Sequence, residues 1–97
     1  MIIGVCKIEL RLEWNHSLKG KRQVFRSISS RVHSKFNVSI AEIENNDRHT
    51  LLTLGVSCVS NNSRHANEVL SKVVDYIQTL HTDAEFLDYQ MDIITGV

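Results

Sequence analysis

The chain has 97 residues and a mass of 11.1 kDa, with 42% hydrophobic residues, 23% charged residues and no proline. These values exclude a disordered tail or a low-complexity linker and predict one domain. Eleven Lys and Arg residues balance eleven Asp and Glu residues, so the total charge gives no reason to expect a nucleic-acid or membrane partner. No window has the ~18 uncharged apolar residues of a membrane span, and we expect a cytoplasmic protein.

The first half of the chain predicts a helix with one strand before it and one strand after it. Residues 2–13 alternate between apolar and charged side chains, which is the pattern of a half-buried strand. Asn15 and Ser17 offer a turn and a helix N-cap, and apolar residues then recur at helical spacing, which predicts a helix over about 17–36. Residues 37–45 alternate, are rich in β-branched side chains and predict a second strand.

The second half predicts a strand, a helix and a strand. Asn46 and Asp47 indicate a turn, after which residues 50–60 alternate and complete a hairpin. Asn61, Asn62 and Ser63 supply caps for a helix over about 64–80, whose apolar residues form one stripe. Residues 85–95 alternate again and predict the last strand.

The predicted order is therefore β-α-β-β-α-β, within a single ferredoxin-like domain over residues 1–97. This α+β arrangement places two helices on one face of a four-stranded antiparallel sheet and leaves the other face open. Because the fold hosts enzymes, sensors and RNA binders alike, it does not indicate a function.

The sequence offers little material for catalysis or metal binding. Cys6 and Cys58 lie in apolar runs and are expected to be buried free thiols, and no two histidines have the spacing of metal ligands on one helix face. Glycine-rich phosphate loops and nucleophile motifs are absent. Asp88 and Asp92 would stand roughly 13 Å apart along one strand, too far for a retaining carboxylate pair. We therefore expect no enzyme, no metal and no cofactor.

Charge is distributed unevenly along the chain. Residues 14–41 contain no Asp or Glu but hold six of the eleven positive charges, namely Lys19, Lys21, Arg22, Arg26, Arg31 and Lys35. Residues 73–97 contain carboxylates but no Lys or Arg. On a helical wheel four of the residues of the first helix fall on one side and form what we call the basic stripe: Lys19, Arg22, Arg26 and His33.

The start of the first helix has three cations where helix stability favours Asp or Glu. Lys19, Lys21 and Arg22 lie beside free backbone N–H groups, and each is unfavourable there by about 0.3–1 kcal/mol. With a phosphate bound at the helix start, the same cations would instead be favourable. The sequence thus predicts an RNA-binding or anion-binding site. The alternative interpretation is that these cations are only solvated surface residues. The candidate residues are Ser17, Lys19, Lys21, Arg22 and Arg26.

The open sheet face and Trp14 each have two interpretations. The central strands of the expected open face offer no aromatic residue, which argues against the base-stacking surface of RNA-recognition motifs. Its apolar residues instead predict a dimer or partner surface, and they are Ile3, Val5, Ile43, Leu51, Val59 and Phe86. Trp14 either covers the core or stacks on a base.

Several short runs resemble one family. They are NHSLKGKR at 15–22, FNVSIAE at 36–42, LGV at 54–56, Ser60-Asn61, the opening MIIGV and Leu87-Asp88-Tyr89. Together they resemble the YlxP-like family of small uncharacterised bacterial proteins. The resemblance implies a ferredoxin-like fold and a link to ribosomes or RNA, since the family's genes commonly lie beside those for transcription termination, translation initiation and ribosome maturation. It implies no catalytic residue. The serine-rich first helix departs from relatives, which are more charged there.

Two functional hypotheses follow. The first is a non-enzymatic binding module for structured RNA, with ribosomal RNA or a ribosome precursor as partner and with the basic helix start as the site. The second is a homo-oligomeric protein-interaction or small-ligand-sensing domain, such as a homodimer, that uses the open sheet face.

Overall fold

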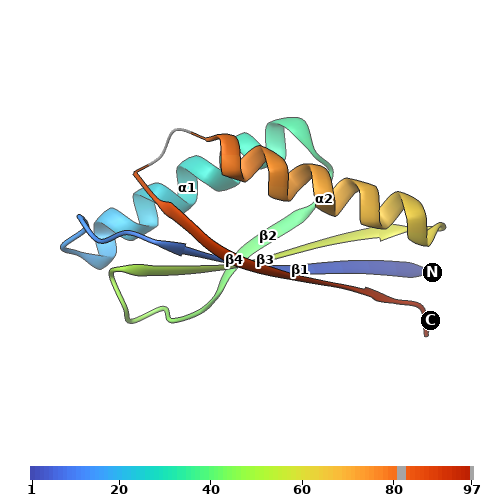
Figure 1. The fold of residues 1–97 in the computed structure, drawn as a ribbon, viewed down its shortest axis with the longest axis horizontal. Coiled ribbons are helices and arrows are strands. Elements are labelled where there is room, and N and C mark those ends of the chain that lie inside the picture. The colour runs from blue at the N-terminus through green and yellow to red at the C-terminus, as the bar shows by residue number, and fades with distance from the viewer. Residues whose placement is uncertain (81–82, 97) are drawn as a thin grey trace.

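A computed structural model of the chain describes residues 1–80 and 83–96 (Figure 1). The elements are β1 (Ile2–Arg11), α1 (Leu18–Lys35), β2 (Ser39–Glu44), β3 (Leu51–Ser60), α2 (Ser63–Thr79) and β4 (Glu85–Ile94). The predicted order β-α-β-β-α-β is confirmed, and the ends of each element lie within two residues of the predicted ones.

The four strands form one antiparallel sheet in the order β2-β3-β1-β4. The two strands that α1 connects, β1 and β2, are separated in the sheet by β3. The two strands that α2 connects, β3 and β4, are separated by β1. Both helices cover the same side of the sheet (Figure 1). This is the predicted ferredoxin-like arrangement, and it leaves the second sheet face without a covering layer.

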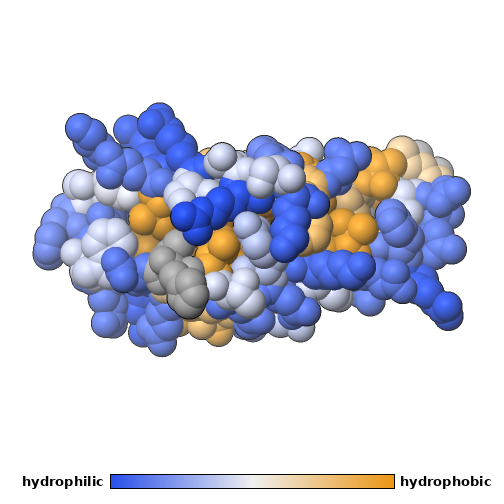
Figure 2. Space-filling view, turned by 90° about the horizontal axis from the view of Figure 1, so that it is seen from above, coloured by the Kyte–Doolittle hydropathy of each residue, from blue (hydrophilic) through white to orange (hydrophobic). Residues whose placement is uncertain are grey.

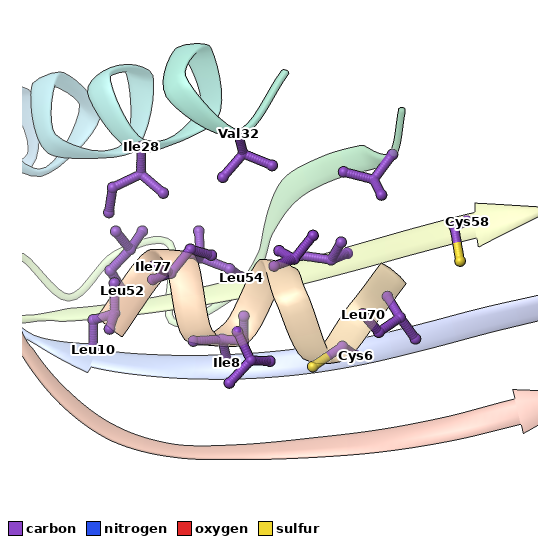
Figure 3. Close-up of a cluster of buried hydrophobic side chains, with 14 of the residues drawn as sticks. Cys6, Ile8, Leu10, Ile28, Val32, Leu52, Leu54, Cys58, Leu70 and Ile77 are labelled. Carbon is purple, nitrogen blue, oxygen red and sulfur yellow. The ribbon is translucent and has the colours of Figure 1, made fainter. Parts of the chain in front are cut away.

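The core lies between the sheet and the helices (Figure 3). Cys6, Ile8 and Leu10 of β1 point toward the helices and are at most 4% exposed, as the alternating pattern predicts. The contribution of α2 to this core is larger than that of α1: α2 buries five residues, whereas α1 buries only Lys21, Ile28 and Val32. The helix α2 packs over β1, β3 and β4, while α1 lies over β2 and beside α2. Helix α1 therefore keeps a broad solvent-exposed side.

The outer surface of the helix layer is mostly hydrophilic, and hydrophobic atoms show there only in patches (Figure 2). No helix within the described part of the chain is long and apolar enough to cross a membrane. Both cysteines are buried and unpaired, as expected. Burial raises the pKa of the Cys6 thiol to about 11.

Two strand irregularities change which side chains share a face. The pairing of β1 with β4 shifts by one residue at Leu87, so Phe86 pairs with Leu10 and packs against the core. The expectation that Phe86 lies on the open face is therefore wrong, and Leu87 lines that face instead, in a groove with Glu9 and Arg11. A second shift, in β2, occurs at Ile43.

Candidate functional site

The segment 15–21 is held in place by buried polar contacts. Asn15 is 4% exposed, and its Nδ2 donates to the carbonyl groups of Ser17, at 2.8 Å, and His49. The Ser17 hydroxyl accepts from the backbone N–H of Gly20 at 3.0 Å, the N-cap that the sequence predicts. A larger residue does not fit at Gly20, because its Cβ atom would collide with Asn15 Oδ1.

Lys21 is the most deeply buried charged side chain of the described residues, at 1% exposure. Its Nζ donates to the carbonyl groups of Asn45, at 2.8 Å, and Arg48, at 2.7 Å. The Oε2 atom of Glu42 lies 2.7 Å from the same nitrogen. Glu42 reaches this position because its partner in β3 is the buried Leu54, which places Glu42 on the helix side of the sheet.

These contacts form what we call the buried polar network: Asn15, Lys21, Glu42 and the carbonyl groups of Asn45, Arg48 and His49. The network joins the start of α1 to the loop between β2 and β3. Lys21 therefore serves the fold, and its ammonium is closed to an external phosphate. The structure thus places the Lys21 ammonium inside the buried polar network, whereas Lys19 and Arg22 are exposed.

The other candidate residues are exposed. Lys19, Arg22 and Arg26 have exposed side chains on α1, and none of them forms an ion pair with a described residue. His33 continues the same side of the helix toward its end and is also exposed. The basic stripe is thus present as an uncompensated surface of α1, which contains no carboxylate. Ser17 is exposed beside it, with its oxygen occupied by the N-cap bond.

The sequence did not single out two residues of the loop between β2 and β3. Arg48 and His49 are exposed, and their backbone carbonyls accept from Lys21 and Asn15, which places the loop next to the start of α1. The local sequence indicates only a turn at this point. That this loop lies next to the start of α1 is visible only in the tertiary structure. A weak signal existed for Lys21 itself: it precedes Ile28 by seven residues and so shares the buried side of the helix.

Trp14 is anchored at one edge and open on the other. Its Nε1 donates to the carbonyl of Asp83 at 2.7 Å, which ties the β1–α1 connection to the segment before β4. The ring is 45% exposed. Trp14 is therefore fixed through its polar atom, while nearly half of its surface is open to solvent.

The open sheet face contains a shallow groove of about 720 Å³. Two rows of opposed residues cross it: Ala41, Gly55, Lys7 and Gln90 in one, and Ser39, Ser57, Val5 and Asp92 in the other. No aromatic side chain belongs to these rows, in agreement with the sequence. Lys7 pairs with Glu44 at 3.0 Å, and this hydrogen-bonded contact raises the pKa of Lys7. The groove therefore offers small and apolar side chains with a charged border.

Among the described residues, the titratable side chains do not cluster as metal ligands would. Within residues 1–80 and 83–96, no three His, Cys, Asp or Glu side chains are grouped so that they could hold a metal ion. Asp88 and Asp92 each accept the backbone N–H of the following residue, at 2.8 Å. Their carboxylates are thus engaged with the edge of the sheet.

Comparison with known proteins gives a family. A family described as "Protein of unknown function (DUF503)" matches residues 3–91. The chain belongs to the DUF503 family. It is also 35% identical over 78 residues to "Uncharacterized protein YlxP" of Bacillus subtilis (strain 168). The aligned residues cover 80% of this chain and 85% of the relative. The predicted resemblance to YlxP-like proteins is confirmed.

The DUF503 match covers both the buried polar network and the exposed cations of α1. Within the NHSLKGKR run, Asn15, Gly20 and Lys21 meet structural requirements, while Lys19 and Arg22 meet none that the described residues show. The run thus combines residues with structural contacts and two exposed cations without such contacts.

Proposed function

We propose that the chain is a non-enzymatic binding module that docks on structured RNA through the basic stripe of α1. The observation that supports this most is the set of exposed cations at Lys19, Arg22 and Arg26, which have no carboxylate partner among the described residues. Solvated cations of a stable surface are usually interspersed with carboxylates, and a one-sign surface attracts a polyanion.

The geometry of the stripe favours contact with a phosphate backbone over contact with bases. A rise of 1.5 Å per residue separates Lys19 from Arg26 by about 10 Å and from His33 by about 21 Å along one side of the helix. No aromatic ring belongs to this side, so base stacking is not the basis of recognition. Such contacts position a protein on RNA and read its shape.

Ribosomal RNA or a ribosome precursor is the partner that we propose. Two observations support this. Genes of the YlxP-like proteins that the chain resembles commonly lie beside those for ribosome maturation, and the exposed charges of α1 are all positive. His49, whose backbone carbonyl accepts from Asn15 near the helix start, extends the proposed surface beyond the residues that the sequence indicated.

The test is co-sedimentation of the chain with ribosomal subunits and precursors over a series of salt concentrations. The variant is Lys19→Gln/Arg22→Gln/Arg26→Gln, which removes three exposed cations and leaves the buried Lys21 in place. The matched control is Arg31→Gln/Arg64→Gln/Lys72→Gln, which changes the net charge equally at exposed residues outside the stripe.

We expect the stripe variant to lose most binding and to reduce the slope of log affinity against log salt by roughly one for each phosphate contact removed. The control is expected to keep most of its binding. Equal losses in both variants would show a response to net charge alone and would contradict the site. Unchanged binding of the stripe variant would contradict it as well.

A further inference from the structure

The groove on the open sheet face has a floor of small side chains. Ala41 of β2 and Gly55 of β3 lie opposite each other, and Ser39 and Ser57 form the adjacent pair. Large side chains rise on both sides of this floor: Ile43, which is 46% exposed, on the β2 side and Val5 on the β1 side. The result is an elongated depression with apolar walls.

Gly55 allows the wall residue Ile43 to lie close to the floor of the groove. A Cβ atom at this position would lie 2.7 Å from Cγ2 of Ile43, so the side chain of Ile43 packs directly onto the glycine backbone. The strand irregularity in β2 occurs at Ile43 and brings its side chain over Gly55. The groove is therefore built into the backbone of two strands.

The open sheet face around the groove carries more carboxylates than cations. Strand register places two cations, Lys7 and Arg11, on the open face, and each has a carboxylate partner there. Arg48, from the loop between β2 and β3, lines the same end of this face as Glu9 and Arg11. The carboxylates of the same face outnumber them: Glu9, Glu44, Glu85, Asp88 and Asp92. Glu9, Asp88 and Asp92 form no ion pair with any described residue. This face therefore has an excess of negative charge.

Charge decides between a second copy and another partner. Two open faces brought together would oppose the same excess of negative charge, which disfavours a symmetric dimer through this face. A partner segment with cations beside an apolar stripe would instead place its apolar residues on Val5 and Ile43. Its cations would lie near Asp92 and Asp88. Charge complementarity of this kind steers association and fixes orientation.

The free edge of β4 favours a helix as the partner segment over an added strand. Asp88 Oδ1 accepts from the N–H of Tyr89, and Asp92 Oδ1 accepts from the N–H of Ile93. These bonds occupy N–H groups that an incoming strand would need. Addition of a partner strand is thus disfavoured at the β4 edge.

We infer that the open sheet face is a docking surface for a basic amphipathic helix of a partner protein. The helix lies in the groove over Ala41, Gly55 and Ser57, and its cations contact the carboxylates of this face. The surface is separate from the basic stripe, which lies on the other side of the sheet, so the inference does not depend on RNA binding.

The experiment is a titration of the ¹⁵N-labelled full chain with two probe peptides, followed by NMR. One peptide has Leu and Lys at positions that create a single apolar side of a helix, and the other has Glu at every Lys position. The expected result is that the Lys peptide shifts the amide signals of Val5, Ala41, Gly55 and Ser57, whereas the Glu peptide does not.

Two variants sharpen the test. Asp88→Asn/Asp92→Asn removes two charges but keeps an oxygen that can accept the same N–H bonds, and we expect roughly fivefold weaker binding of the Lys peptide. Ala41→Trp fills the groove and is expected to abolish binding. Its control, Ser30→Trp on the exposed side of α1, should bind as the parent does.

Three outcomes would overturn the inference. They are equal binding of both peptides, signal shifts confined to other surfaces, and unchanged affinity in Asp88→Asn/Asp92→Asn. Sedimentation equilibrium identifies the competing occupant: a dimer that Ala41→Trp converts to a monomer would show that a second copy covers this face.

Discussion

The Nζ atom of Lys21 lies 2.7 Å from the Oε2 atom of Glu42, and this ion pair connects the buried side of α1 to β2. Removing only one member leaves a buried charge without its counterpart. We therefore expect Lys21→Met to lower the free energy of unfolding by about 3–5 kcal/mol in urea titrations. Lys21→Met/Glu42→Gln should recover part of this loss. Lys19→Met, an exposed neighbour, is the control and should change stability little; equal effects at both lysines would contradict the structural role of Lys21.

Gly20→Ala tests the contact between Gly20 and Asn15. The added methyl group would meet Asn15 Oδ1, and Asn15 cannot move away without giving up its two hydrogen bonds. We expect a loss of about 1–3 kcal/mol in the free energy of unfolding, typical of overpacking at a well-packed site. Gly96→Ala provides the comparison, because nothing lies within 4 Å of its added atom. If both variants unfold at the same denaturant concentration, the close approach at Gly20 is not limiting.

Asn45 combines a positive φ of 58° with a side-chain bond from Nδ2 to Thr53 Oγ1 at 2.9 Å. Asn45→Gly removes the bond but suits the backbone, whereas Asn45→Ala removes the bond and also strains the backbone. Thermal unfolding should therefore rank the parent above Asn45→Gly and Asn45→Gly above Asn45→Ala, with about 1 kcal/mol between the two variants. The reverse order of the variants would show that φ at this residue does not matter.

Cys6 is protected by burial, and its thiol has a pKa raised to about 11. In the folded chain it should react slowly with a thiol reagent at pH 8, and quickly after denaturation. Because the pKa of the folded thiol lies above its ordinary value of 9.0, the folded state binds the proton more tightly. This contribution to stability is complete below pH 9.0 and is lost as the pH rises through about 11. Denaturant midpoints of the parent and Cys6→Ala over this range should converge; parallel curves would contradict the shift.

The fold could be predicted from sequence because its signals are local. Cys6, Ile8 and Leu10 alternate as a strand must, and Ser17 is a helix cap in the sequence and in the structure. Phe86 was misplaced because an inserted residue in a strand reverses the alternation without leaving a local signal.

The candidate site was only partly predictable. Exposed Lys19 and buried Lys21 are both lysines of the first helical turns, and composition does not distinguish them. What separates them is a partner far along the chain, since Glu42 and the carbonyls of residues 45 and 48 surround one ammonium and not the other. Helical spacing from Ile28 gave a hint about Lys21, but spacing alone did not reveal its acceptors.

The buried polar network also determines how freely the proposed binding surface can move. Asn15 and Lys21 hold the carbonyl groups of His49 and Arg48, so the loop and the helix start are parts of one rigid body. Ordering a loose loop on binding a polyanion would cost conformational entropy and lower the affinity. Here the loop is already ordered when the chain folds. Asn15→Ala keeps every charge of the surface yet releases the carbonyl of His49, so a drop in RNA affinity in that variant would show that this ordering contributes to binding.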